Sequence, residues 1–289
     1  MDPLLAGILG LVVFLILVIL GMWVAFAAAL VGLACILVVK GWAAMGGIAG
    51  YIPFQSAASF EFSVIPLFII MGLFAHYGGL TGDLFYMARQ WFGHYPGGLG
   101  IASTFGCAVF AAISGSSTAA TAVMGKVCIP EMRKYNYDLK LAAGTIAAGG
   151  TLDAMIPPSV AMVLFGVMAE QSVGTIMIAG YIPGIIEALF FILLIYLWCR
   201  RIPNAGPALP AASWGQRVAS LRKVWAILLL AGLVFGGLYG GFFTATEAGG
   251  VGAFGAFIIA LCLRKLTWSN FKASLLETGK ITAMIFATI

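Results

Sequence analysis

Charged residues are scarce in this sequence. They make up 9% of its 289 residues, whereas a soluble domain carries about a quarter. Such a chain has too little polar side chain to cover a globule, which excludes a soluble enzyme, and its 62% hydrophobic content excludes a disordered chain. The apolar runs are long and unbroken rather than alternating, which argues against a transmembrane β-barrel. The sequence therefore predicts an all-α, polytopic membrane protein.

Metal-binding and redox side chains are also rare. His76 and His94 are the only histidines, and they are too few and too far apart to suggest a metal site. The cysteines are odd in number and none belongs to a CxxC pair, so we interpret them as buried small residues rather than disulfides or ligands. The net charge of +5 does not indicate a nucleic-acid partner, because basic loops orient membrane proteins. The five cysteines are Cys35, Cys107, Cys128, Cys199 and Cys262.

The apolar runs predict the spans. Residues 4–39 contain no charge and would make ~54 Å of helix, so we expect two spans with a break at residues 21–23. Further spans are expected at residues 60–77, 175–199, 224–239 and 248–263. Residues 40–59 and 267–276 are expected to form interfacial arms. An apolar run starts at residue 281 and reaches the last residue, so we expect a fragment of a longer protein, truncated at its C-terminus.

Residues 97–130 contain two apolar segments that are too short to cross a membrane comfortably. Residues 97–113 would make ~25 Å of helix and residues 118–130 ~20 Å, and the polar run Ser114-Gly115-Ser116-Ser117 separates them. A helix, a turn at membrane depth and a helix back form a re-entrant hairpin, which is tolerated where protein or a watery cavity covers it.

The basic residues predict the orientation. Arg and Lys cluster in residues 200–223, which makes this loop cytoplasmic. Counting spans from it places the other basic loops on the same side and the amino terminus outside. Two spans, an arm and a third span occur in residues 4–77 and begin again at residue 224, five crossings later. The second series is therefore inverted, as in secondary transporters.

The helix predicted at residues 139–169 is broken by Pro157 and Pro158, which free the carbonyls four residues earlier. The break and the hairpin tip are expected at the same depth, ~20 Å from the cytoplasmic side. Freed carbonyls and hydroxyls there can coordinate a dehydrated cation, and the start of a half-helix can hold a carboxylate. The candidate cation ligands are Ser114, Gly115, Ser116, Ser117, Gly150, Thr151, Asp153 and Pro157; the candidate substrate residues are Ser117, Thr118, Pro158 and Ser159.

Two acids stand out among the predicted spans. Asp153 lies beside the break, where a carboxylate usually serves an ion or a proton; the alternative is a structural salt bridge or a helix cap. Glu187 lies midway along a span, where a hydrogen bond between spans and a transport role are both open. The hairpin hydroxyls also have a simpler reading, as N-caps of the second hairpin helix.

Two strings carry a family resemblance. ISGSSTAATAVMGKVCIPEMRKYNYD (residues 113–138) resembles the first hairpin of the large membrane subunit of TRAP, or tripartite ATP-independent periplasmic, transporters, and GGTLDAMIPPSV (residues 149–160) resembles its Pro-Pro break. IPLFIIMG (residues 65–72) and TATEAGGVGAFGAF (residues 244–257) also fit. The family often has Gly where Asp153 stands, and its second hairpin would lie beyond residue 289.

The resemblance implies a sodium-driven, elevator-type importer in the bacterial inner membrane. Such a permease works with a small four-helix membrane subunit and a periplasmic solute-binding protein, and its substrates are carboxylates. The family's sodium sites join the hairpin tip to the broken helix. The expected regions are therefore scaffold spans and an arm (1–77), a transport part (78–170), a closing span with its cytoplasmic loop (171–223) and the start of the second repeat (224–289).

Three other functions are considered. The first is a carboxylate or ion transporter of the same superfamily that works without a binding protein. The second is an intramembrane serine hydrolase using Ser116 or Ser117, which would need a histidine at the depth of the serine. The third is a membrane scaffold that transports nothing, which leaves the paired breaks unexplained.

Overall fold

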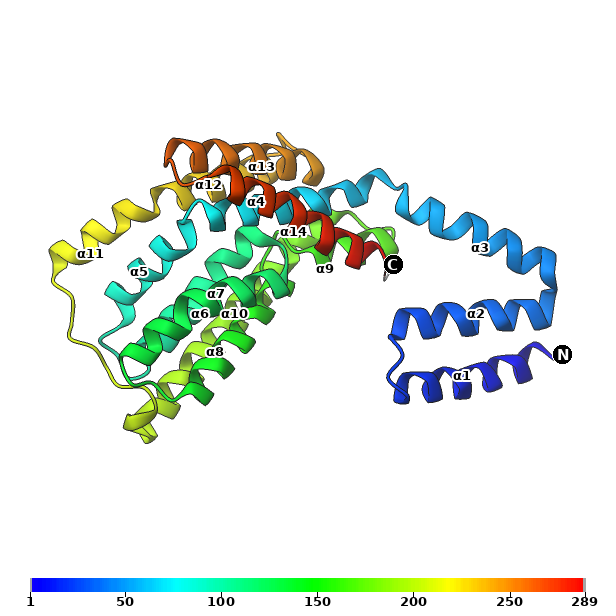
Figure 1. Cartoon of the computed structure of the whole chain (residues 1–289), viewed down its shortest axis with the longest axis horizontal. Coiled ribbons are helices and arrows are strands. Elements are labelled where there is room, and N and C mark those ends of the chain that lie inside the picture. The colour runs from blue at the N-terminus through cyan, green and yellow to red at the C-terminus, as the bar shows by residue number, and fades with distance from the viewer. Residues whose placement is uncertain (1, 288–289) are drawn as a thin grey trace. The chain divides into compact units, whose positions relative to one another are not determined.

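The computed structural model describes residues 2–287, apart from the side chains of residues 56, 57 and 119 (Figure 1). Within this part of the chain every regular element is helical and no β-strand occurs, which confirms the all-α prediction. The described residues form two compact units. One contains residues 2–62 and 280–287, and the other contains residues 63–279.

The first unit contains α1 (Pro3–Ile19), α2 (Val24–Lys40) and α3 (Trp42–Ala57). The second contains α4 (Val64–Tyr77), α5 (Leu80–Phe92), α6 (Gly98–Ser114), α7 (Ser117–Lys134), α8 (Leu139–Thr151), α9 (Val160–Met168), α10 (Val173–Arg201), α11 (Trp214–Leu221), α12 (Trp225–Tyr239) and α13 (Ala245–Cys262). Residues of α14 (Trp268–Phe286) belong to both units. Short 3₁₀ turns occur at η1 (Phe60–Ser63), η2 (Leu152–Ala154), η3 (Pro203–Ala205) and η4 (Arg222–Val224).

Four helical segments of the described residues are long and apolar enough to cross a membrane: Phe60–Tyr77, Val173–Arg201, Trp214–Tyr239 and Ala245–Cys262. Three of them match the predicted spans at residues 60–77, 175–199 and 248–263 to within a few residues. The fourth contains the predicted span at residues 224–239 but begins ten residues earlier, in the predicted loop. The chain is therefore a multi-pass membrane protein. Helices α1 and α2 have 17 residues each, or ~26 Å. They are separated at the expected residues 21–23, where Gly21 has a φ of +89°.

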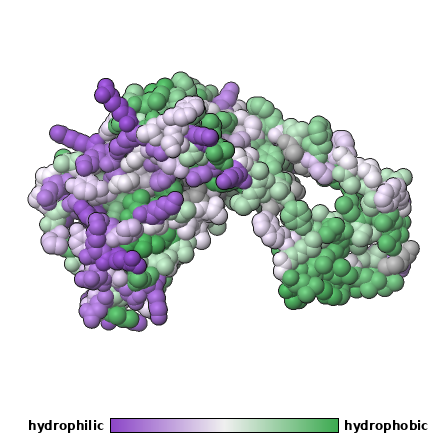
Figure 2. Space-filling model, viewed as in Figure 1, coloured by the Kyte–Doolittle hydropathy of each residue, from purple (hydrophilic) through white to green (hydrophobic). Residues whose placement is uncertain are grey.

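The first unit packs through small residues. An added Cβ at Gly10 of α1 would lie 2.6 Å from the sulfur of Cys35 on α2, so these two helices approach closely. Their outward faces are apolar, and Leu4, Ile19 and Leu20 are each at least 73% exposed. Figure 2 shows this surface as almost continuously hydrophobic. Such a surface suits lipid or a protein partner rather than water.

Helix α4 of the second unit is largely buried and packs against α13. Gly249 and Gly252, one turn apart on α13, let the helices approach; a Cβ at Gly252 would overlap the sulfur of Met71. Small residues of this kind are what membrane helices use to pack closely. Near the other end of α4, Phe74 stacks on Phe271 of α14 with ring centroids 5.9 Å apart.

Three segments differ from the sequence prediction. Residues 80–92 form α5, to which no element was assigned, and their amphipathic spacing buries Leu80, Leu84 and Ala88. The predicted polar loop at residues 200–223 contains α11, which begins with a capping box between Ser213 and Gln216. Residues 267–276 do not form a separate arm but continue in α14 without a break. The only glycine of α14 is Gly279. A single glycine inside a helix costs only ~1 kcal/mol, so Gly279 does not end α14.

The loop after α10 is attached to the base of the hairpin through the backbone. Gly97 N–H donates to the Gly206 carbonyl (2.9 Å), Asp138 N–H to the Ala205 carbonyl (3.0 Å), and Leu209 N–H to the carbonyl before α6, that of Gly93 (2.9 Å). The loop therefore joins the start of α6 to the start of α8. Hydrophilic side chains gather near the ends of α7, α8 and α10 (Figure 2).

All five cysteines are free thiols, as predicted. Cys107, Cys128 and Cys199 are buried and Cys35 is half-buried, but Cys262 is exposed. The prediction of burial is wrong for Cys262, because it is the last residue of α13 and lies beyond the close contact with α4.

Candidate functional site

The hairpin at residues 97–130 consists of α6 and α7. Helix α6 ends at Ser114, the C-cap Gly115 adopts a left-handed φ of +60°, and α7 begins at Ser117. A left-handed residue is what commonly ends a helix, and glycine adopts it without strain. A turn of two residues, Gly115 and Ser116, thus connects the helices at the expected polar run. Helix α7 extends to Lys134, past the expected end at Pro130, because a single proline did not terminate it.

The helix predicted at residues 139–169 is interrupted as expected. Helix α8 ends at Thr151, the 3₁₀ turn η2 follows, and α9 begins at Val160 after the Pro157–Pro158 pair. The peptide bond between these prolines is cis. Since prolines donate no N–H, residues 155–159 leave the helical ladder, and the two half-helices end and begin beside the hairpin.

The hairpin tip and the broken helix touch each other. The Ser114 hydroxyl donates to the Asp153 carboxylate at 2.8 Å, and Val160 N–H, at the start of α9, donates to the Gly115 carbonyl at 3.3 Å. The Asp153 carboxylate also accepts hydrogen bonds from the backbone of Ser116 and the side chain of Ser117. One carboxylate therefore accepts hydrogen bonds from three serines of the tip.

Three glycines make this close approach possible. A Cβ at Gly72 of α4 would lie 2.5 Å from the Ser114 Cα, and one at Gly115 would lie 3.3 Å from the Pro158 carbonyl oxygen. A Cβ at Gly150 of α8 would overlap the hydroxyl of Thr121 on α7. Sequence reasoning named Gly115 and Gly150 but not Gly72 or Thr121. The small residue in the IPLFIIMG string was the signal for Gly72.

The tip is rich in oxygen atoms. The hydroxyls of Ser116 and Thr118 lie 3.3 Å apart, and the Thr121 hydroxyl donates to the Ser117 carbonyl at 2.8 Å. Asp153 is 2% exposed, so its charge is shielded from water, where a carboxylate needs hydrogen bonds or a cation to be tolerated. Among the described residues no group of three His, Cys, Asp or Glu side chains could hold a metal ion. A cation here would depend on hydroxyls, carbonyls and this single carboxylate.

Some predicted site residues point elsewhere. The Thr151 hydroxyl interacts with the Ala148 carbonyl (2.6 Å) and with the Glu187 carboxylate on α10 (3.1 Å), so its oxygen faces α10. The contact is the hydrogen bond between spans that was one of the two readings of Glu187. The Ser159 hydroxyl donates to the freed carbonyl of Ala154 (3.1 Å). The hydroxyls of Thr151 and Ser159 are therefore engaged away from the hairpin tip, and the candidate site contains fewer residues than the sequence predicted.

The four candidate substrate residues differ in accessibility. Pro158 and Ser159 are buried, whereas Ser117 is half-buried and Thr118 is exposed. A carboxylate that reached the tip would meet the start of α7 first, where backbone N–H groups and the positive end of the helix dipole attract anions.

Neither histidine supports hydrolase chemistry at the tip. The His94 Nδ1 lies 3.5 Å from an Arg217 nitrogen, and the His76 Nδ1 is buried without a partner among the described residues. A serine nucleophile requires a base within hydrogen-bond reach, and these contacts direct His94 toward Arg217 and leave the His76 Nδ1 without a partner in the part of the chain that the structure describes.

Together these features define a multi-pass α-helical membrane protein in which a helical hairpin is closed by a broken helix. The family model of the tripartite ATP-independent periplasmic transporter DctM component matches residues 11–289. The chain belongs to this family.

Similar curated relatives carry different substrate names. The C4-dicarboxylate TRAP transporter large permease protein DctM of Pseudomonas aeruginosa is 37% identical, over 82% of this chain and 55% of the relative. The 2,3-diketo-L-gulonate TRAP transporter large permease protein YiaN of Escherichia coli is 32% identical (80% and 54%). The sialic acid TRAP transporter permease protein SiaT of Haemophilus influenzae is 31% identical (80% and 37%).

The chain spans about half the length of the curated large permeases it matches. These relatives are transporter permeases rather than enzymes, in agreement with the prediction of a transporter. The alternative of an intramembrane serine hydrolase is therefore dropped.

Proposed function

We propose that the chain acts within the large permease subunit of a secondary active importer that couples carboxylate uptake to sodium. The relatives' names include C4-dicarboxylate, 2,3-diketo-L-gulonate and sialic acid, all of which bear a carboxylate. Membership of the DctM family supports the permease role, and the oxygen-rich hairpin tip supports a hard cation such as sodium as the coupling ion.

The observation that carries the proposal is the contact between the hairpin tip and the broken helix. Sodium needs several oxygens to replace its water shell, and the tip offers the hydroxyl of Ser116 and backbone carbonyls beside the buried carboxylate of Asp153. A cation bound among them would neutralise that carboxylate and fix the hairpin against α9. Substrate binding at the exposed start of α7 would then depend on the ion.

The proposed setting is the bacterial inner membrane, with the basic residues 200–223 on the cytoplasmic side and the amino terminus in the periplasm. The proposed partners are a small four-helix membrane subunit and a periplasmic solute-binding protein. The inverted repeat supports secondary transport, and the elevator-type movement is proposed from the resemblance to TRAP permeases. A member of the same superfamily that works without a binding protein is the second candidate, and uptake that persists without a binding protein would favour it.

The decisive experiment is uptake by the complete, reconstituted complex in proteoliposomes, with imposed sodium or proton gradients and a panel of carboxylic acids. Ser116→Ala removes one neutral oxygen. It should raise the sodium concentration for half-maximal uptake about two- to tenfold, since such a contact contributes ~0.5–1.5 kcal/mol. Asp153→Asn removes the charge while keeping the shape and should weaken the sodium dependence further.

Two variants serve as matched controls. Ser103→Ala removes a buried hydroxyl of α6 that bonds to the Leu99 carbonyl, and Asp138→Asn replaces the N-cap of α8 with another good N-cap. Both should keep wild-type sodium dependence. If Asp153→Asn alone keeps it, the carboxylate is structural and the ion depends on neutral oxygens. If Ser116→Ala and Asp153→Asn both keep it in an active complex, the proposed ion site is wrong.

A further inference from the structure

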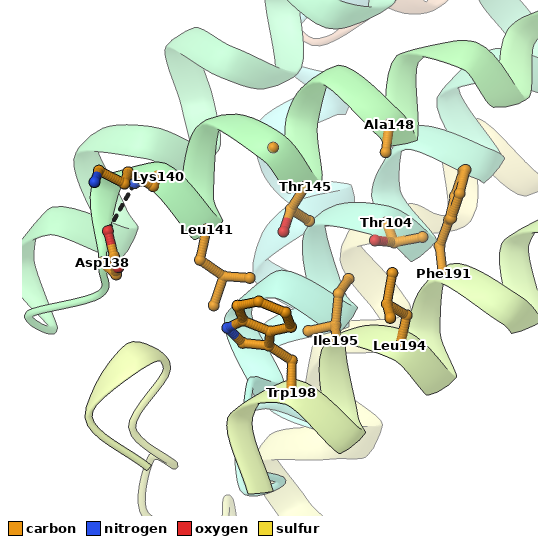
Figure 3. A pocket seen from close by; sticks show the side chains of 11 residues that line it. Thr104, Asp138, Lys140, Leu141, Thr145, Ala148, Phe191, Leu194, Ile195 and Trp198 are labelled. Atoms are coloured by element: carbon orange, nitrogen blue, oxygen red, sulfur yellow. Dashed lines mark hydrogen bonds between the residues drawn. The ribbon is translucent and has the colours of Figure 1, made fainter. Parts of the chain in front are cut away.

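A groove separate from the hairpin tip runs along the second unit between α8 and α10, with α6 as its floor (Figure 3). Its volume is about 420 Å³, within the ~300–1,000 Å³ typical of ligand sites. Leu141, Phe191 and Ile195 supply apolar walls. Leu194 and Trp198 on α10 are 60% and 52% exposed, so the groove is open along the side that these two residues border.

One polar group inside the groove has no partner. Thr145 of α8 is 5% exposed, lines the groove, and its hydroxyl makes no hydrogen bond within the described part of the chain. By contrast, the hydroxyl of Thr104 on the groove floor donates to the Gly100 carbonyl at 3.1 Å. A buried hydroxyl without a partner is costly, so the Thr145 side chain favours a ligand that brings a hydrogen-bond acceptor to this depth.

Two basic residues and one acidic residue lie near the mouth of the groove, where α10 leaves the apolar region. Lys140 lines this end, and Arg201 stands one helical turn beyond Trp198 on α10. Neither basic side chain makes an ion pair among the residues that the structure describes. The acidic neighbour Asp138 is engaged in capping α8 through the Lys140 N–H (2.8 Å). A tryptophan beside basic residues is typical of a membrane–water boundary.

We propose that this groove is a specific binding site for a phospholipid with an anionic headgroup. The phosphate contacts Lys140 and Arg201, an ester carbonyl accepts the hydrogen bond of Thr145, and one acyl chain fills the apolar part of the groove. The spacing suits this order: Thr145 lies five residues from Lys140 along α8, ~7.5 Å deeper. The site is independent of the proposed ion site, since the hairpin tip contributes no residue to it.

The competing occupant is a helix from the rest of a longer permease. The basic residues at the mouth distinguish a lipid from a helix as the occupant. A transmembrane helix has no need of two unpaired cations beside a boundary tryptophan, whereas an anionic lipid is attracted to basic residues by ~1 kcal/mol each. The lipid is therefore the occupant that the groove's chemistry favours.

The test is native mass spectrometry of the full-length permease complex with phosphatidylglycerol, phosphatidylethanolamine and phosphatidylcholine of identical acyl chains. The wild type should retain phosphatidylglycerol best. Lys140→Gln should reduce that retention about fivefold without changing phosphatidylcholine, while the exposed Lys272→Gln on α14 should change neither. Thr145→Val should lower retention of all three lipids about fivefold, yet raise the thermal stability of the delipidated complex, because it removes a buried hydroxyl that has no partner.

A filled groove gives the strongest control. Gly144 lines the groove and has open space where a Cβ would be, so Gly144→Leu should occupy the groove and abolish specific retention. Gly232→Leu on α12, which also has open space, should not. Equal retention by wild type and Gly144→Leu, or equal effects of Lys140→Gln and Lys272→Gln, would overturn the proposal. It would also be overturned if the wild type retained the three lipids equally.

Discussion

Substituting Gly150 with alanine tests the contact between α7 and α8 on which the candidate site depends. The added Cβ would overlap the Thr121 hydroxyl and lie 3.1 Å from the Thr121 Cβ. Thr121 can rotate away only by giving up its hydrogen bond to the Ser117 carbonyl, which contributes ~1 kcal/mol. Overpacking costs ~1–3 kcal/mol, whereas the alanine gains up to ~1 kcal/mol of helix propensity. We therefore expect a net loss of ~1–2 kcal/mol.

The assay is thermal unfolding of the purified full-length complex. Gly144→Ala is the matched control, because Gly144 lies in the same helix with nothing within 4 Å of an added Cβ, and it should be neutral or stabilising. Gly150→Ala should lower the unfolding temperature by a few degrees, since ~1 kcal/mol shifts it by ~2–4 °C in proteins of moderate size. The uptake assay should also show weakened sodium dependence, because the tip is displaced.

A second substitution tests whether the Thr121 hydroxyl is the cause of the expected loss of stability. Thr121→Ala removes the overlapping hydroxyl and leaves only the 3.1 Å contact, so the double variant Gly150→Ala/Thr121→Ala should be less destabilised than the sum of the two single variants by ~1 kcal/mol or more. Additive effects, or equal unfolding temperatures for Gly150→Ala and Gly144→Ala, would refute the close approach of the two helices.

Three further predictions follow from the topology, the tip and the hairpin base. Single cysteines at Ser213 and Gly241 in a cysteine-free background should be labelled from opposite sides of the membrane; labelling from one side would remove the inverted-repeat argument. A cysteine at Ser116 should react from the side to which the transport cavity is open and be protected by sodium; access from outside in every state, whatever the ion, would indicate an ordinary surface loop. Burial raises the pKa of Tyr137 to about 12, because a charged phenolate is disfavoured in this environment, whereas the Leu99 N–H (3.0 Å) acts in the opposite direction. The stability that depends on a neutral Tyr137 should therefore be complete below about pH 10 and lost as the pH rises through 12. Tyr137→Phe should abolish that alkaline step in a pH series of unfolding temperatures.

The breaks were the most predictable part of the structure. Gly115 in a run of small polar residues and the Pro157–Pro158 pair impose local backbone rules that neighbouring helices do not override, so both interruptions were found from the sequence. The spans were predictable for a similar reason, because their length and hydropathy are properties of single segments.

Side-chain direction was less predictable. Thr151 was expected to face the hairpin, but its hydroxyl interacts with Glu187 on another helix, and this depends on how α8 is rotated against α10. Helix α5 was missed because Asp83 and Arg89 interrupt its apolar pattern; in the structure Arg89 pairs with Glu131 of α7. Such pairings between distant residues have no local signal in one sequence.

The attachment of the hairpin at both ends has a mechanical consequence. The loop after α10 ties down its base through Gly97 and Gly206, and Asp153 and Val160 hold its tip. A hairpin held by hydrogen bonds at both its base and its tip cannot swing about one end. Swinging it open alone would require several hydrogen bonds to break together, at ~1 kcal/mol each. The least costly displacement is one in which α6, α7, α8, the start of α9 and the loop after α10 move together as a single rigid block.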